Sequence, residues 1–166
     1  MKFSASLLFF LLLGFSACKY SEKYSTVEVN KQFSLDIPSW LKEDNTLKEG
    51  APFQYANRFR NFYTIAESVP CEQSNLQQLS DANIEVVKKV LDNPLVTDSV
   101  DVNYNNAKGV RVEILGAMDG EKIYFSEVML QGGKSCYHLS IWTRSEERKL
   151  RFKDDIQKIL SSFREL

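Results

Sequence analysis

The chain lacks the residue spacings that identify common catalytic and metal sites. It has one histidine and three cysteines in 166 residues, and no C-x₂-C or H-x₃-H pair that would form a zinc site. It contains no G-x-S-x-G, no glycine-rich phosphate loop and no H-E-x-x-H. The sequence therefore identifies no catalytic residue, no metal ligand and no cofactor, and we expect a protein that is not an enzyme.

An excess of positive charge is also missing. The formal net charge is −1, with 21 lysines and arginines against 22 aspartates and glutamates. A protein that follows a phosphate backbone carries clustered cationic residues, so we expect no nucleic-acid partner. Residues 58–63 interleave basic and aromatic side chains as a single-strand binding platform would. The charge balance favours a hairpin instead, with its aromatic rings packed inward and its arginines solvated at the turn.

The mature part of the chain has no apolar run comparable with the one at the N-terminus. That run covers residues 7–17, follows Lys2 and ends at Cys18. It is shorter than the roughly 20 apolar residues of a membrane-spanning helix, and polar residues follow it at once. This pattern is typical of a secretory signal.

Residues 15–18, Phe-Ser-Ala-Cys, resemble the lipobox of bacterial lipoproteins, in which a peptidase cuts before a cysteine that carries a diacylglyceryl group. The resemblance implies a signal peptide over residues 1–17, an acylated Cys18 in a tether over residues 18–25, and a domain over residues 26–166. More than one acyl chain gives stable attachment, because each buried CH₂ contributes about 0.8 kcal/mol. Ordinary signal-peptidase cleavage after Ala17 is the competing interpretation, which the large side chain of Phe15 disfavours.

Lys19 stands where lipoproteins retained at the inner membrane commonly have an aspartate. The resemblance therefore implies the outer membrane, if the cell has one, with the membrane contacted through the N-terminal lipid. Whether the domain faces the periplasm or the outside stays open.

Two cysteines, Cys71 and Cys136, are left once Cys18 is acylated. An even pair in an oxidising compartment can close a disulfide. The alternative is two buried thiols that pack as small apolar side chains. The sequence leaves this choice open because it does not give the distance between the two Cα atoms.

Apolar periodicity divides the domain into strands and helices. Alternation predicts a first hairpin, with strands over residues 26–29 and 33–37 and a turn at Asn30 and Lys31. Helical spacing predicts a helix from a capping box at Ser74 and Gln77 to residue 91. Further strands are expected over residues 53–59, 63–68, 95–103, 110–114, 122–130 and 135–143.

Two glycine dipeptides and a closing helix complete the pattern. Asp119-Gly120 and Gly132-Gly133 predict two-residue hairpin turns, which need positive φ. A second long amphipathic helix is expected near the C-terminus, capped by Thr143 and Glu146. The elements predict an α+β fold: a three-layer α/β/α sandwich with a mostly antiparallel sheet and two long amphipathic helices. The strand over residues 135–143 carries sizeable or apolar groups on both faces, so we expect it to be central and covered on both.

This order of elements resembles the PsbP-like family, an α/β/α sandwich that includes many bacterial lipoproteins. The resemblance is carried by residues 33–40, a strand ending in Pro38 with Trp40 two residues on; by residues 55–57; and by the closing residues 159–163. It spans most of residues 24–166. Because members mostly act as non-catalytic binding or assembly factors, it implies a binding role, and no family binding residue carries over to a position here.

The sequence thus predicts a lipid-anchored, non-catalytic envelope protein that binds a protein or another envelope component. The alternative is a small-ligand or metal carrier, or an enzyme, with a pocket near Cys136, His138 and Trp142. Cys136 and His138 share one strand face about 7 Å apart, and Cys71 could complete a Cys/Cys/His set. A strand histidine is more often a hydrogen-bonded structural residue, so we expect no metal there.

Overall fold

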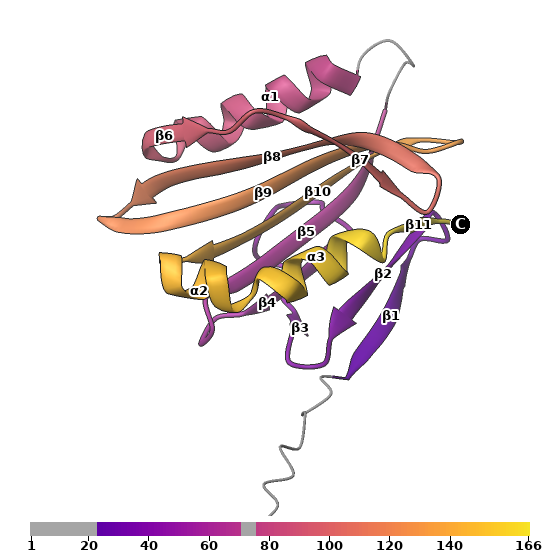
Figure 1. Cartoon of the computed structure of the whole chain (residues 1–166). Helices are drawn as coiled ribbons and strands as arrows, with labels where there is room; N and C mark the ends of the chain where they lie inside the picture. Colours follow the sequence, from indigo (N-terminus) through magenta and orange to yellow (C-terminus); the bar gives the residue numbers. More distant parts are fainter. Residues whose placement is uncertain (1–22, 71–75) are drawn as a thin grey trace, which may run out of the picture.

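The computed structural model describes residues 23–70 and 76–166, which form two antiparallel sheets and three helices (Figure 1). The large sheet has the strand order β3-β4-β5-β10-β9-β8-β6, and β7 also pairs with β8. Its strands are β3 (Lys42–Glu43), β4 (Phe53–Asn57), β5 (Phe62–Val69), β6 (Asp92–Val96), β7 (Val100–Tyr104), β8 (Ala107–Met118), β9 (Glu121–Gln131) and β10 (Cys136–Arg144). The expected α+β class with a mostly antiparallel sheet is confirmed.

A small sheet has the order β1-β2-β11. It consists of β1 (Tyr24–Val29), β2 (Phe33–Pro38) and β11 (Arg164–Glu165). Asn30 and Lys31 have φ values of 50° and 56°, and a turn with positive φ at its central residues matches the twist of the flanking strands. The predicted first hairpin is therefore confirmed, and β1 begins at Tyr24.

The helices lie on opposite sides of the large sheet. Figure 1 shows α1 (Leu76–Lys89) on one side, over β8 and β9, and α2 (Glu146–Arg151), α3 (Lys153–Ser161) and the small sheet on the other. Of the helix expected up to residue 91, α1 includes residues 76–89. The strand expected from residue 95 begins earlier, because Asp92, Asn93 and Pro94 already belong to β6.

The prediction of a second long helix is wrong. The chain forms two short helices that meet at Phe152, whose φ and ψ are −98° and 9°. The ring of Phe152 is buried, with centroids 5.4 Å from Trp40 and 5.3 Å from Phe62. The expected cap at Thr143 and Glu146 is also wrong, because Ser145 Oγ accepts the hydrogen bond from the Arg148 N–H. The break between α2 and α3 thus coincides with the packing of the Phe152 ring, which the apolar spacing of the sequence did not predict.

The two predicted glycine turns have different outcomes. Asp119 and Gly120 have φ values of 54° and 77° and join β8 to β9, as expected. Gly132 and Gly133 do not form a two-residue turn, because residues 132–135 make a longer connection between β9 and β10. The strand expected over residues 95–103 is likewise divided into β6 and β7, which both pair with β8.

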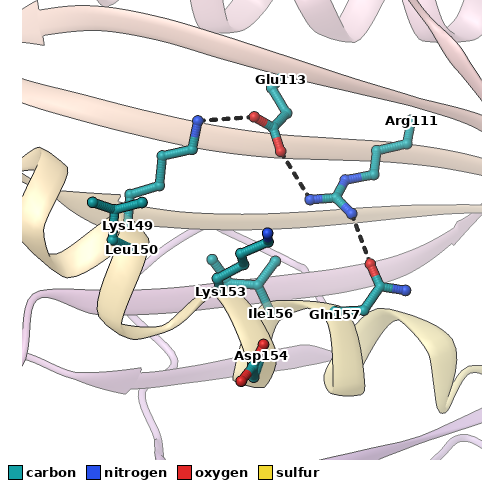
Figure 2. A pocket seen from close by; sticks show the side chains of 8 residues that line it. All are labelled: Arg111, Glu113, Lys149, Leu150, Lys153, Asp154, Ile156 and Gln157. Carbon is teal, nitrogen blue, oxygen red and sulfur yellow. Dashed lines mark hydrogen bonds and ion pairs between the residues drawn. The ribbon is translucent and has the colours of Figure 1, made fainter.

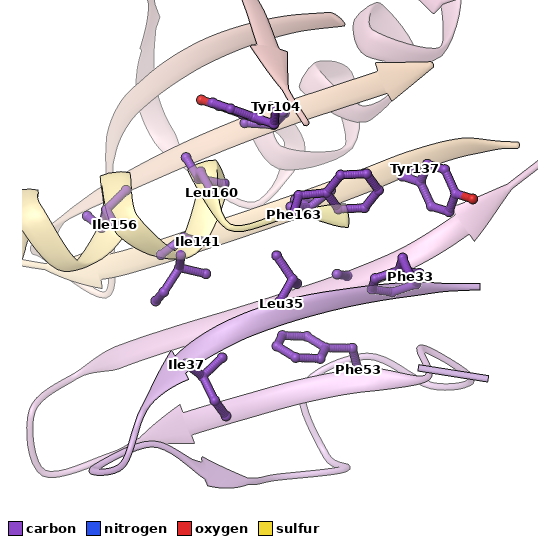
Figure 3. Close-up of a cluster of buried hydrophobic side chains, with 14 of the residues drawn as sticks. Phe33, Leu35, Ile37, Phe53, Tyr104, Tyr137, Ile141, Ile156, Leu160 and Phe163 are labelled. Atoms are coloured by element: carbon purple, nitrogen blue, oxygen red, sulfur yellow. The ribbon is translucent and has the colours of Figure 1, made fainter. Parts of the chain in front are cut away.

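Strand β10 lies between β5 and β9 and separates two apolar clusters. Tyr137, Leu139 and Ile141 belong to the larger cluster, with β2 and α3 (Figure 3). Trp142 packs on the opposite side, against the smaller cluster. The prediction of a central strand covered on both faces is confirmed, since every residue from Cys136 to Ile141 is buried.

Candidate functional site

A cavity of about 460 Å³ lies between strand β8 and helices α2 and α3 (Figure 2). Its lining residues are Arg111, Glu113, Lys149, Leu150, Lys153, Asp154, Ile156 and Gln157. A second cavity, of about 590 Å³, lies against β7 and shares Arg111, Glu113 and Gln157 with the first. The two cavities therefore adjoin at these three side chains, and we call the two together the α3 groove.

The floor of the α3 groove is a network centred on Arg111. Arg111 and Glu113 project from the same face of β8 because they are two residues apart. The Arg111 guanidinium donates to Ser126 Oγ at 2.8 Å, to Gln157 Oε1 at 3.0 Å and to Glu113 Oε1 at 3.0 Å. All three guanidinium nitrogens are thus held, so Arg111 is a fixed part of the wall.

Helix α2 adds the other side of the network. Lys149 Nζ donates to Glu113 Oε2 at 2.9 Å and lies 5.2 Å from the centroid of the Tyr124 ring. Glu113 therefore bridges two cations, one from the sheet and one from the helix (Figure 2). On the rim, the side chain of Leu150 is 68% exposed. Sequence reasoning missed this site, because its residues come from β8, α2 and α3 and only the fold brings them together.

The predicted site residue His138 lies in a buried cluster on the other face of the sheet. His138 Nε2 is 2.6 Å from Glu127 Oε2, and Nδ1 is 3.3 Å from Glu67 Oε1. Ser140 donates to the other oxygen of Glu127, and Lys48 donates to Glu67. The strand register explains the cluster. His138 on β10 lies directly opposite Glu67 on β5, and Ser140 on β10 lies directly opposite Glu127 on β9.

The charged neighbours of His138 and Glu67 outweigh burial in setting the pKa values of both groups. Burial alone would lower the pKa of His138, but hydrogen bonds and ion pairs with Glu127 and Glu67 outweigh it and raise the pKa to about 9. The hydrogen bond from His138, with help from Lys48 and against the effect of burial, lowers the pKa of Glu67 to about 2. Near neutral pH His138 is therefore a buried cation paired with two carboxylates, one of which, that of Glu67, is also paired with Lys48.

The residues of the alternative interpretation's pocket, Cys136, His138 and Trp142, are packed against their neighbours. Cys136 and His138 are 0% and 5% exposed, and Trp142 is stacked between Tyr63 and Phe125 at centroid distances of 5.3 and 5.6 Å. Within residues 23–70 and 76–166, no group of three metal-ligating side chains is placed to hold a metal ion. Cys71 and Cys18 lie outside the described residues, so their predicted roles stay predictions.

The basic and aromatic segment over residues 58–63 agrees with the expected hairpin only in part. Phe62 is fully buried and Arg58 is exposed, as predicted. The prediction of inward aromatic rings is wrong for Phe59, whose side chain is 93% exposed at the β4–β5 turn.

No family model and no curated protein matches this chain by sequence. Solved structures resemble its fold. The Saccharomyces cerevisiae Ran-binding protein Mog1p is 11% identical with a TM-score of 0.60, over 87% of this chain and 96% of that one. LpqN, involved in cell envelope biogenesis of Mycobacterium tuberculosis, is 9% identical with a TM-score of 0.60, over 87% and 91%. Cyanobacterial PsbP from Synechocystis sp. PCC 6803 is 9% identical with a TM-score of 0.58, over 93% and 99%.

These similarities show the fold, which is that of PsbP and Mog1. At such low identity they assign no residue role, because one fold supports many unrelated sites. The helices of residues 23–70 and 76–166 include none that is both long enough and apolar enough to cross a membrane.

Proposed function

We propose that this chain is a lipid-anchored, non-catalytic protein of the cell envelope that binds another protein through the α3 groove. The observation that carries the proposal is that the charged groups on the floor of the groove are already paired with one another. Arg111, Glu113 and Lys149 are held by one another and by Gln157. A pre-formed surface of fixed side chains suits docking, whereas catalysis uses a group within reach of a reacting atom.

The structural neighbours support a binding role. One is described as a Ran-binding protein and another as involved in cell envelope biogenesis. The proposed architecture is the three-layer α/β/α sandwich, with α1 as one outer layer and α2, α3 and the small sheet as the other. The proposed order along the chain is a signal peptide over residues 1–17, a tether from Cys18, and the domain, whose first strand β1 begins at Tyr24, two residues before the expected start at residue 26.

The proposed anchor is an acyl group on Cys18, which would place the domain at the outer membrane of a cell that has one. Substituting Cys18→Ser removes the acylated sulfur. We expect this variant to move from the membrane fraction to the soluble fraction with an unchanged circular dichroism spectrum. Mass spectrometry of the native N-terminus provides the direct measurement, and an unmodified N-terminal amine would refute the anchor.

We also propose that Cys71 and Cys136 form a disulfide. Cys136 is fully buried, and Cys71 lies outside the described residues. In the β5–β10 ladder Cys136 pairs with Val69, two residues before Cys71 in the chain. We expect denatured, unreduced protein to release no thiol from these two positions, and two titratable thiols would contradict the pair.

The rim of the α3 groove indicates the chemistry of the partner. Leu150 offers an exposed apolar side chain, and Lys153 makes no ion pair with the described residues. A partner segment with an apolar side chain beside a carboxylate would match both. The aliphatic side chain of Ile156, which is 8% exposed, also lines the cavity.

A photo-cross-linking amino acid at Leu150 in the acylated protein tests this proposal in intact cells. We expect one dominant protein adduct, which disappears in a Lys153→Glu background because the partner's carboxylate is then repelled. The same cross-linker at Leu95, which is 64% exposed on β6, is the matched control. Equal adducts from both positions, or none from Leu150, would refute docking in the groove.

A small-ligand carrier is the second candidate, and the size of the groove favours it. Cavities of about 460 and 590 Å³ lie within the range of roughly 300 to 1,000 Å³ that small-molecule sites occupy. Native mass spectrometry of the protein extracted from membranes separates the two roles. A retained small molecule that is lost in Lys149→Glu supports the carrier.

A further inference from the structure

Phe59 is the most exposed large apolar side chain among the described residues, at 93%. It lies in the turn between β4 and β5, and that turn is well ordered by hydrogen bonds. The Asn61 N–H donates to the Arg58 carbonyl at 3.2 Å, and the Arg60 N–H donates to Asn57 Oδ1 at 2.9 Å. Phe59 is therefore held outward by a defined turn.

Residues 58–61 form this turn, which we call the Phe59 turn. It lies at the end of the domain where the described chain begins. Asn57 Nδ2 donates to the Trp40 carbonyl at 2.9 Å, and the Arg60 guanidinium lies 4.7 Å from the centroid of the Trp40 ring. One residue before Trp40, the Ser39 N–H donates to the Lys23 carbonyl at 2.8 Å. The turn and the first described residue are thus joined through residues 39–40.

The length of the preceding chain limits how far this end can lie from an anchor at Cys18. Cys18 stands five residues before Lys23, and five extended residues span at most about 18 Å. This step depends on the lipid anchor proposed above. A tether this short keeps the Lys23 end of the domain within about 18 Å of the bilayer surface, and the Phe59 turn belongs to that end.

We propose that the Phe59 turn docks on the bilayer that holds the anchor, with the Phe59 ring inserted among the lipid headgroups. An aromatic side chain is well suited to the boundary between headgroups and acyl chains, because its apolar surface is removed from water there. Arg58 flanks the ring, and its guanidinium is paired with Asp44 at 2.8 Å. Insertion of the ring, more than attraction to anionic lipid, therefore provides the contact. Docking fixes the orientation of the domain on the membrane.

Quenching of a tryptophan at position 59 tests the proposal. The acylated full-length Phe59→Trp protein is reconstituted into phosphatidylethanolamine and phosphatidylglycerol vesicles with brominated acyl chains, and its emission is compared with that in unbrominated vesicles. The unsubstituted protein gives the baseline from Trp40 and Trp142. Leu95→Trp is the matched control, since Leu95 is also exposed but lies on β6 at the far edge of the large sheet.

We expect brominated lipid to quench Phe59→Trp several-fold more strongly than Leu95→Trp, with little change when phosphatidylcholine replaces phosphatidylglycerol. Quenching no greater than that of Leu95→Trp in acylated protein overturns the docking and leaves the anchor standing. Mass spectrometry on the same sample tests the anchor itself. An unacylated Cys18 would overturn both the proposed anchor and the proposed docking.

Discussion

The Tyr137 hydroxyl donates a hydrogen bond of 2.7 Å to Glu165 Oε1, which joins the central strand β10 to the last strand of the chain. The same carboxylate accepts from three successive backbone N–H groups, those of Gly133, Lys134 and Ser135, at 2.7, 2.9 and 3.3 Å. The loop between β9 and β10 thus closes around a side chain that lies about 30 residues further along the chain.

Substituting Glu165→Ala should destabilise the protein by about 2 kcal/mol, because four donors lose a charged acceptor. Urea denaturation monitored by circular dichroism measures the loss. Tyr137→Phe is the matched control and should lose about 1 kcal/mol, since it removes one hydrogen bond and keeps the ring packed against Phe33. Equal losses from the two variants would contradict the role assigned to the loop.

Buried His138 should make stability depend on pH on the alkaline side. Its pKa is about 9 in the folded protein against 6.5 for the unperturbed group, so its charge stabilises the fold fully below pH 6.5 and less as pH rises through 9. The pKa of Glu67 changes from 4.5 to about 2, so its contribution is present above pH 4.5 and is lost toward pH 2. Together the two groups favour greatest stability between pH 4.5 and pH 6.5.

We expect the free energy of unfolding to fall by about 2 to 3 kcal/mol between pH 6.5 and pH 9. The measurement is urea denaturation across that range. His138→Gln, which keeps hydrogen-bonding capacity without the charge, should be less stable at pH 6 and should lack the alkaline decline. An unchanged slope in this variant would show that another group causes the decline.

Thr143→Val should raise the stability of the protein. The Thr143 side chain is fully buried, and its hydroxyl has no hydrogen-bond partner among the described residues. An unpaired buried hydroxyl costs about 1 to 3 kcal/mol in desolvation, and valine has nearly the same shape. We expect a higher melting temperature in differential scanning calorimetry, and a gain of about 1 kcal/mol. A lower melting temperature would indicate that the hydroxyl has a partner.

Local patterns in the sequence were sufficient for most of the strands. The Asn30-Lys31 and Asp119-Gly120 turns follow from residues that tolerate positive φ. The two faces of β10 follow from alternation of side chains. Local reasoning failed where a distant residue decides the structure. The Gly132-Gly133 connection opens to receive Glu165, and a Cβ atom on Gly132 would lie 2.5 Å from the Glu165 carboxylate.

The candidate site was less predictable than the fold. His138 was identified as the single histidine, but its buried carboxylate partners follow only from the register of β5, β10 and β9. The α3 groove gave no signal, because Arg111 and Glu113 look like ordinary charges on a strand. Their importance comes from α2 and α3, whose separation at Phe152 the apolar spacing did not show.

Glu113→Gln should lower the free energy of unfolding of the protein more strongly at low ionic strength than at high ionic strength. Glu113 is paired with Arg111 and Lys149, and its removal leaves two cations facing each other without a carboxylate between them. The three side chains are each about a third exposed or less, so we expect a loss of only about 1 kcal/mol at low salt, which screening reduces. The measurement is urea denaturation at two ionic strengths.

The double variant Glu113→Gln/Lys149→Gln decides whether this loss comes from the cations. Without the Lys149 charge, repulsion against Arg111 disappears, and the double variant should be less destabilised than the sum of the two single variants. The coupling should weaken when salt is added, as expected for charges that are partly exposed. Simple additivity at low salt would mean that Glu113 acts on each cation separately and that the groove is not one electrostatic unit.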